Sequence, residues 1–258
     1  MLFYLGTHQT EWMERTAVPL FISYIRLSQR RTPRRIPGAR WALDSGGFSQ
    51  LDKLGTWTIE PTKYVDDLYR FLDIIGQPPD FVAIQDWMCE PFILEKTGLD
   101  IYEHQRRTID SWFILNHLAP DIPWLPVLQG WHLDDYFHHA EMYEDAGADL
   151  FGPVGLGSVC RRQGMKEAAE IVRALADVGY WLHGFGFKTQ GLLAVADSLV
   201  SADSMAWSFV ARRENIRLPG HKHLKCNNCL EWALIWRRQL LAKLQATGVY
   251  LDEVVDTA

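Results

Sequence analysis

Eight short apolar runs recur along the chain, and several of the segments between them have the apolar spacing of amphipathic helices. Strands that alternate with helices predict βα units and a parallel sheet. An open doubly wound sheet and a closed (β/α)8 TIM barrel both fit this α/β pattern, and the count of eight favours the barrel. The runs lie at residues 2–6, 19–24, 41–44, 81–86, 124–130, 150–157, 180–186 and 199–203.

Each of the last six runs has a polar residue or glycine at or near its carboxyl end. One acid after a strand is common, because it often caps the next helix. In a barrel, however, all strand carboxyl ends open onto one face, and that face carries the active site. The set therefore indicates a functional site. Its members are Asp44, Asp86, Gln129, Gly155, His183 and Asp203.

These residue types suit glycosidic chemistry on a purine. In a pair such as Asp44 and Asp203, one carboxylate attacks the anomeric carbon while the other moves protons. Asp86 and Gln129 have the acceptors and donors that a purine edge requires. Metal-dependent hydrolysis would use similar acids, but no His-x-His pair stands near a strand end. Space for a flat ring beside Phe48 would come from Gly46, Gly47, Gly155 and Gly157.

Charge and composition predict where the chain is located and which partners it binds. No apolar run has the length of a membrane span, and the first residues lack a secretory signal, so a cytoplasmic location without membrane contact is expected. The net charge of −6 gives no general reason to expect nucleic acid as a partner. Residues 26–40, however, hold six arginines and no acid, and 212–225 form a second basic stretch. Solvated loops and an anionic polymer as partner both explain these clusters.

The DSGGFS sequence at 44–49 resembles the DSGGFQ signature of the tRNA-guanine transglycosylases. The resemblance covers most of residues 40–210, and the later motifs match in order: QD at 85–86, VLQG at 127–130, VGLG at 154–157, HGFG at 183–186 and SADS at 201–204. The segments GLGSVCRR at 155–162, GFGFKT at 184–189 and DSMAWS at 203–208 are most similar to the DpdA-type branch, which places a 7-deazaguanine such as preQ0 into DNA.

This resemblance implies a TIM barrel, release of guanine and a covalent intermediate between an aspartate and C1′ of the nucleoside. On matching positions, Asp203 is the expected nucleophile and Asp44 the general acid/base. The chain would be a pentosyltransferase with no organic cofactor, and its partners would be DNA and the deazaguanine base. The expected substrate-binding set is Ser45, Phe48, Asp86, Gln129, Gly130, Gly155, Leu156, His183 and Gly184, with the Gly155–Leu156 backbone recognising the base.

Two rival functions stay open. One is the same base exchange on tRNA. The other is a catalytically inactive nucleic-acid-binding barrel within a modification complex, because the tRNA enzymes carry a further aspartate where this chain has Ala206. A homo-oligomer and a partner protein of a DNA-modification system are also open. Expected phosphate contacts are Arg30, Arg31, Arg34, Arg35, Arg161, Arg162, Lys188, Arg212 and Arg213.

The segment HKHLKCNNC places His221, His223, Cys226 and Cys229 within nine residues. Two imidazoles and two thiolates are a typical tetrahedral set for structural Zn²⁺. The alternative is a basic linker with two reduced thiols. A helical pattern follows at 230–244, so we expect a barrel over residues 1–215 and a zinc-binding, helical extension over 216–258 that packs on it.

Overall fold

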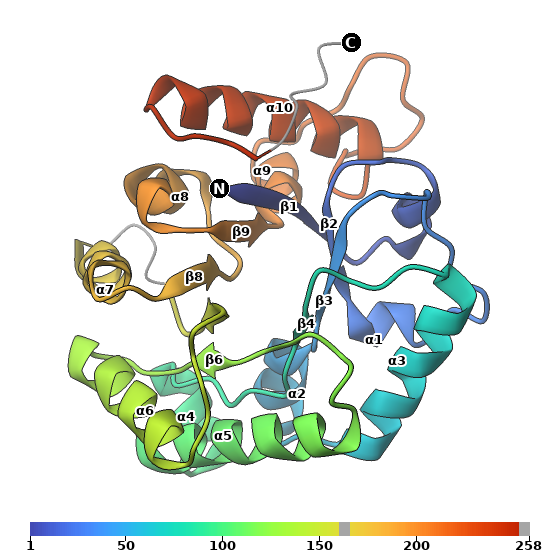
Figure 1. Ribbon diagram of the computed structural model, residues 1–258. Coiled ribbons are helices and arrows are strands. Elements are labelled where there is room, and N and C mark those ends of the chain that lie inside the picture. The colour runs from blue at the N-terminus through green and yellow to red at the C-terminus, as the bar shows by residue number, and fades with distance from the viewer. Residues whose placement is uncertain (160–165, 253–258) are drawn as a thin grey trace.

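The computed structural model describes residues 1–159 and 166–252 and has the expected parallel barrel (Figure 1). Every strand pair is parallel, and the sheet order is β5-β4-β3-β2-β1-β9-β8-β7-β6. The strands are β1 (Leu2–Thr7), β2 (Leu20–Ser23), β3 (Trp41–Asp44), β4 (Val82–Ala83), β5 (Trp124–Leu125), β6 (Val127–Leu128), β7 (Pro153–Leu156), β8 (Trp181–Gly184) and β9 (Ser201–Ser204).

The nine strands occupy eight barrel positions, because β5 and β6 are halves of one strand. Only Pro126 separates them, and β5 pairs with β4 while β6 pairs with β7. Proline has no N–H to donate to a ladder, which explains the break. Its carbonyl still accepts from the N–H of Gly155 at 2.8 Å. The chain therefore closes the sheet at this point, and the expected (β/α)8 TIM barrel is confirmed.

Helices surround the barrel (Figure 1). They are α1 (Tyr24–Leu27), α2 (Gly47–Leu54), α3 (Pro61–Ile75), α4 (Pro91–Thr97), α5 (Ile101–Leu118), α6 (Leu133–Asp145), α7 (Lys166–Asp177), α8 (Thr189–Val195), α9 (Ala206–Arg213) and α10 (Leu230–Ala246), with 3-10 turns η1 (Thr10–Glu14) and η2 (Ala196–Ser198). In the arginine-rich segment 26–40, only the first two residues are helical, as the end of α1. In the described part of the chain, none of the helices is both long and apolar enough to cross a bilayer.

The hydrophobic core has two layers. Side chains alternate across a strand, so neighbours in β1 serve different layers: Tyr4 points into the barrel, while Phe3 and Leu5 pack toward the helices. Inside the barrel Tyr4 joins Phe21 and Phe81. This aromatic filling forms the floor on which a site at the strand ends can rest.

The segment after residue 215 packs against the barrel. Trp236 and Leu240 of α10 are buried in the same hydrophobic cluster as Phe3 of β1, and the indole N–H of Trp232 donates to the carbonyl of Trp207 at 2.9 Å. Figure 1 shows α10 lying across the outside of α8 and α9. A domain boundary at residue 215 stays a prediction.

Candidate active site

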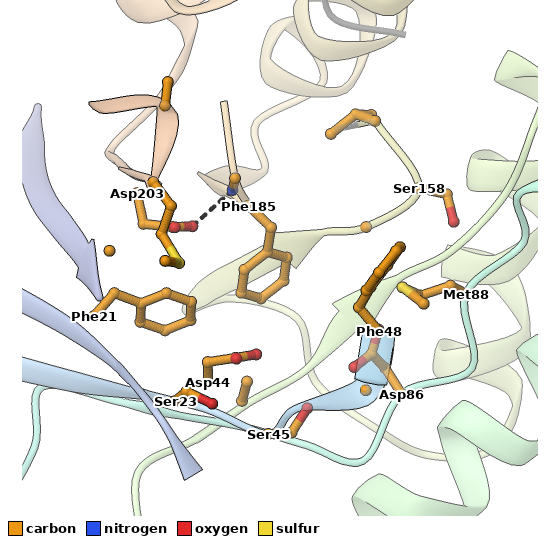
Figure 2. Close-up of a pocket in the computed structure, with 18 of the residues that line it drawn as sticks. Phe21, Ser23, Asp44, Ser45, Phe48, Asp86, Met88, Ser158, Phe185 and Asp203 are labelled. Carbon is orange, nitrogen blue, oxygen red and sulfur yellow. Dashed lines mark hydrogen bonds between the residues drawn. The ribbon is translucent and has the colours of Figure 1, made fainter. Parts of the chain in front are cut away.

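A pocket of about 450 Å³ lies at the carboxyl ends of the strands, the face where TIM-barrel active sites are found. This volume is within the range of small-molecule sites. In Figure 2, Asp44 and Asp203 lie toward one side of the pocket, and Phe48, Asp86, Met88 and Ser158 lie toward the other. The ring of Phe185 lies between the two groups, and the ring of Phe21 lies on the side of Asp44 and Asp203. Four of the six polar strand ends therefore meet in one cavity: Asp44, Asp86, Gln129 and Asp203.

The DSGG sequence builds a tight turn that holds Asp44. Its Oδ1 accepts from the backbone N–H of Gly46 at 3.2 Å. Gly46 has a φ of 84°, and a Cβ there would lie 2.5 Å from a side-chain carbon of Ile25. Only glycine fits both demands. Gly47 then begins α2 beside Asp86, since a Cβ on it would lie 3.3 Å from Oδ1 of that residue.

Asp203 is held by the loop that follows β8. The N–H of Gly186 donates to its Oδ1 at 2.7 Å. Nε2 of His183 lies 3.7 Å from the same oxygen, beyond hydrogen-bond distance, while Nδ1 of this ring contacts the hydroxyl of Ser201 at 2.8 Å. His183 is fully buried among the aromatic rings of the barrel interior. It therefore lies beneath the pocket.

Two pocket carboxyls have raised pKa values. Burial raises the pKa of Asp44 to about 6; the Gly46 N–H opposes this shift and the negative charge of Asp203 adds to it. Burial raises the pKa of Asp86 to about 7, with further increases from Asp44 and Glu90 and an opposing hydrogen bond from Gln129. Groups that titrate near neutral pH are suited to proton transfer.

Asp86 and Gln129 form a connected pair. Nε2 of Gln129 donates to Oδ2 of Asp86, and Oε1 of Gln129 accepts from the hydroxyl of Ser158 at 2.7 Å. The backbone of Gln129 is also fixed, because its N–H donates to Nδ1 of His139 at 2.8 Å. An acceptor and a donor thus stand side by side at the pocket wall, as reading a purine edge requires.

The other expected substrate contacts divide into two groups. Ser45 and Phe48 line the pocket, and Phe48 is partly exposed in it. Strand β7 ends at Leu156, before the pocket. The described residues that line the cavity at this point are Gly157, Ser158 and Val159, which follow the strand, and not the expected Gly155–Leu156 backbone. Five expected positions lie outside the described lining: Gly130, Gly155, Leu156, His183 and Gly184.

Basic residues gather at the rim beside α9. Lys188 and Arg212 line the pocket. Lys188 and Arg213 also lie over the ring of Phe209, at 5.9 and 5.7 Å from its centroid. Phe209 lines the same pocket and is 48% exposed. The sequence prediction did not include Phe209, although an apolar residue beside two arginines, just after the Asp203 strand, was a usable signal.

The arginine-rich segment contributes less to this rim than expected. Arg35 is buried, and its guanidinium donates to the carbonyls of Met13, Thr16, Val18 and Arg40, near the ends of β2 and β3 that lie away from the pocket. Its assignment as a phosphate contact is therefore wrong. Arg30 pairs with Glu14 at 2.7 Å, whereas Arg31 and Arg34 are exposed. Arg161 and Arg162 fall outside the described residues.

The four predicted metal ligands converge. One ligand atom from each of His221, His223, Cys226 and Cys229 lies within 4.8 Å of all the others. Three ligand pairs are 3.1 to 3.5 Å apart. Tetrahedral Zn²⁺ with ordinary bond lengths needs separations of about 3.3–3.8 Å, so the set fits this ion.

Two further contacts resemble the surroundings of known zinc sites. Nδ1 of His221 faces the cluster, while its Nε2 lies 2.9 Å from a carboxylate oxygen of Glu231. Carboxylates commonly orient a ligating imidazole in this way. The N–H of Leu218 donates to the sulfur of Cys226 at 3.3 Å.

A protein-family model matches the chain over almost its whole length. The model of the family described as "DpdA: DeoxyPurine in DNA protein A" matches residues 1–257. No curated protein matches the chain. The family match includes both the pocket and the His/Cys cluster, so it applies to the barrel and the extension together.

Proposed function

The chain belongs to the DpdA family, and on this premise we propose that it is a DNA-guanine transglycosylase that exchanges guanine in DNA for a 7-deazaguanine such as preQ0. The observation that carries the proposal is the meeting of Asp44 and Asp203 in one pocket with the Asp86–Gln129 pair. The first two supply the chemistry of base exchange, and the second two supply recognition of the base.

In the first half of the proposed reaction, a carboxylate oxygen of Asp203 attacks C1′ of the target nucleotide. The C1′–N9 bond breaks as the oxygen–C1′ bond forms, and the departing guanine takes a proton from Asp44. The raised pKa of Asp44, about 6, favours this role because a carboxyl must be protonated to act as an acid.

In the second half, the incoming deazaguanine loses its N9 proton to the Asp44 carboxylate. Its N9 then attacks C1′ and displaces Asp203. Bonds and protons balance, because each base that leaves or enters carries one proton at N9. Two successive displacements at C1′ restore the original configuration of the nucleoside.

The substrate polymer must deliver one nucleotide into the pocket. A base inside a duplex is out of reach, so the target guanine must leave the stack. Lys188, Arg212 and Arg213 are suitably placed to hold flanking phosphates. We also propose that Arg31 and Arg34, whose side chains are exposed, contact the DNA further from the pocket.

The extension has a separate proposed role. We infer that His221, His223, Cys226 and Cys229 hold a structural Zn²⁺. The bound Zn²⁺ would crosslink the loop after α9 to the start of α10, because Cys229 immediately precedes that helix. The ion takes no part in the exchange steps.

The test of the proposed function is base exchange with the purified chain. DNA or tRNA is incubated with preQ0, digested to nucleosides and analysed by mass for the deazaguanine nucleoside. Product in DNA alone is the expected result. Product in tRNA alone would favour the tRNA rival. Absence of product in both, together with salt-sensitive DNA binding, would favour an inactive binding barrel.

A further inference from the structure

The side-chain amide of Gln129 is held at both of its polar atoms. Its Nε2 donates to Asp86, and its Oε1 accepts from Ser158. In the described part of the chain, the second N–H on Nε2 has no protein partner, and Gln129 lines the pocket. Gln129 is buried. With its carbonyl bonded to Ser158, this N–H is the hydrogen-bonding group that the amide has left for a base in the pocket.

Reversing this amide would be costly. When Asp86 is ionised, as it is above its pKa of about 7, the Gln129 carbonyl would then meet a carboxylate oxygen, and two acceptors cannot bond to each other. Asp86 alone does not fix the orientation of the amide, however. In the proposed function the same carboxylate must also accept hydrogen bonds from the N–H groups of the bound base. The contact from Ser158 holds the opposite atom and does not compete with the base.

Ser158 is itself fixed by its neighbours. Its hydroxyl accepts from the N–H of Cys89 at 2.7 Å and lies 3.0 Å from Oε2 of Glu90, compared with 2.7 Å from Oε1 of Gln129. All of these groups are buried. A hydroxyl has a single proton, and the shorter contact is the one to Gln129.

The backbone around Ser158 accommodates this contact at some cost. Ser158 has a φ of 55°, which is uncommon for a residue with a side chain. At Gly157, a Cβ would lie 2.2 Å from Nε2 of Gln129, so any side chain there would displace the amide. Strained or crowded backbone that persists beside a pocket is a typical sign of a functional constraint.

We propose that Ser158 is a positioning residue that fixes the Gln129 amide as a hydrogen-bond donor, so that the pocket accepts bases with a carbonyl at C6 and rejects bases with an amino group there. Guanine and 7-deazaguanines present an acceptor to the free N–H, whereas adenine presents a second donor. A site built around such a contact discriminates strongly against a base that leaves it unpaired. This inference rests on the proposed function, which supplies the purine.

The test compares binding of free guanine and free adenine to the full chain without DNA, by calorimetric or competition titration. The variant Ser158→Gly removes the hydroxyl and suits the positive φ, so it removes the contact without adding strain. Ser158→Ala is the second variant. We expect either change to weaken guanine binding about tenfold and to reduce the guanine-to-adenine preference by at least that factor.

A matched control is Ser208→Ala, which deletes another buried hydroxyl, bonded to the carbonyl of Asn227 at 2.7 Å and outside the described pocket lining. It should leave the preference unchanged. If wild type binds guanine and both Ser158 variants keep the full preference, the positioning role is overturned. If wild type binds neither guanine nor preQ0, the proposed function fails instead.

Discussion

The backbone N–H of Gly186 donates to Oδ1 of Asp203 at 2.7 Å, so the loop after β8 holds the carboxylate at the end of β9. The carbonyl of Asp203 in turn accepts from the N–H of Phe187 at 3.0 Å. The first bond orients the carboxylate and the second fixes the backbone that carries it, before any substrate arrives. Such preorganisation is what a nucleophile needs, because it need not be ordered during the reaction.

We expect Asp203→Asn to lower base exchange by on the order of 10³-fold or more, because an amide oxygen is a poor nucleophile for C1′. The asparagine has the same shape and can still accept from Gly186. Folding should therefore be retained, as thermal unfolding would show. The readout is the deazaguanine nucleoside measured by mass after digestion of the DNA.

A second readout is the covalent intermediate. Wild type incubated with DNA should give a protein–DNA adduct that survives denaturation, and Asp203→Asn should not. Exchange within tenfold of wild type in this variant would contradict the assignment of Asp203 as nucleophile.

The raised pKa values of Asp44 and Asp86 predict a pH-dependent cost to stability. For each residue the folded-state pKa, about 6 and about 7, exceeds the ordinary value of 3.8. Below about pH 4 the carboxyls are protonated in both folded and unfolded chains, and no difference arises. As pH rises through the folded pKa, the unfolded chain has already released the proton, so the folded state loses stability.

Asp86→Asn should therefore raise the free energy of unfolding at pH 8 by on the order of 1–3 kcal/mol, and Asp44→Asn by a similar or smaller amount. The gain should shrink toward zero between about pH 7 and pH 4. Urea denaturation at several pH values measures this. The exposed Asp177, changed to Asn, serves as the control. An equal effect of Asp86→Asn at pH 4 and pH 8 would contradict the electrostatic cause.

The barrel could be predicted from the sequence because each strand is marked by its own short apolar run. Each of the eight apolar runs became a barrel strand, and Pro126 altered only the continuity of the fifth. The positions of Asp44, Asp86, Gln129 and Asp203 followed from the rule that strand carboxyl ends share one face. That rule places residues at an end of the barrel without fixing how far each extends beyond it.

Two residues that lie elsewhere than expected, His183 and Arg35, show this limit. His183 and Asp203 both come from adjacent strands, but His183 is one layer lower and points into the aromatic interior. Arg35 lies in a segment whose charge suggested phosphate, yet its guanidinium is bonded to four backbone carbonyls. Such contacts join residues far apart in the chain, and charge patterns do not reveal them. The same is true of the Ser158–Gln129 bond.

The His/Cys cluster predicts one bound zinc per chain. Cys226→Ala should abolish the metal, measured by elemental mass spectrometry, because three ligands do not close a tetrahedral structural site. Loss of the crosslink should destabilise the protein by about 3 kcal/mol, which corresponds to a fall in Tm of about 10 °C. Lys225→Ala, at an exposed neighbouring position, is the control. A metal-free wild type, or an unchanged Tm in Cys226→Ala, would contradict the prediction.

Phe209 lies at the pocket rim beside Lys188 and Arg213, and it is expected to stack on a base next to the displaced nucleotide. Stacking of this kind is worth about 1–3 kcal/mol, so Phe209→Ala should lower exchange in duplex DNA by about 5- to 100-fold, and less in single strands, which need no opening. Phe209→Trp should retain activity. The control is Phe151→Ala, since Phe151 is 88% exposed and precedes β7 at the opposite end of the barrel. Equal losses for Phe151→Ala and Phe209→Ala, or equal losses on duplex and single-stranded DNA, would rule out a stacking role in opening the duplex.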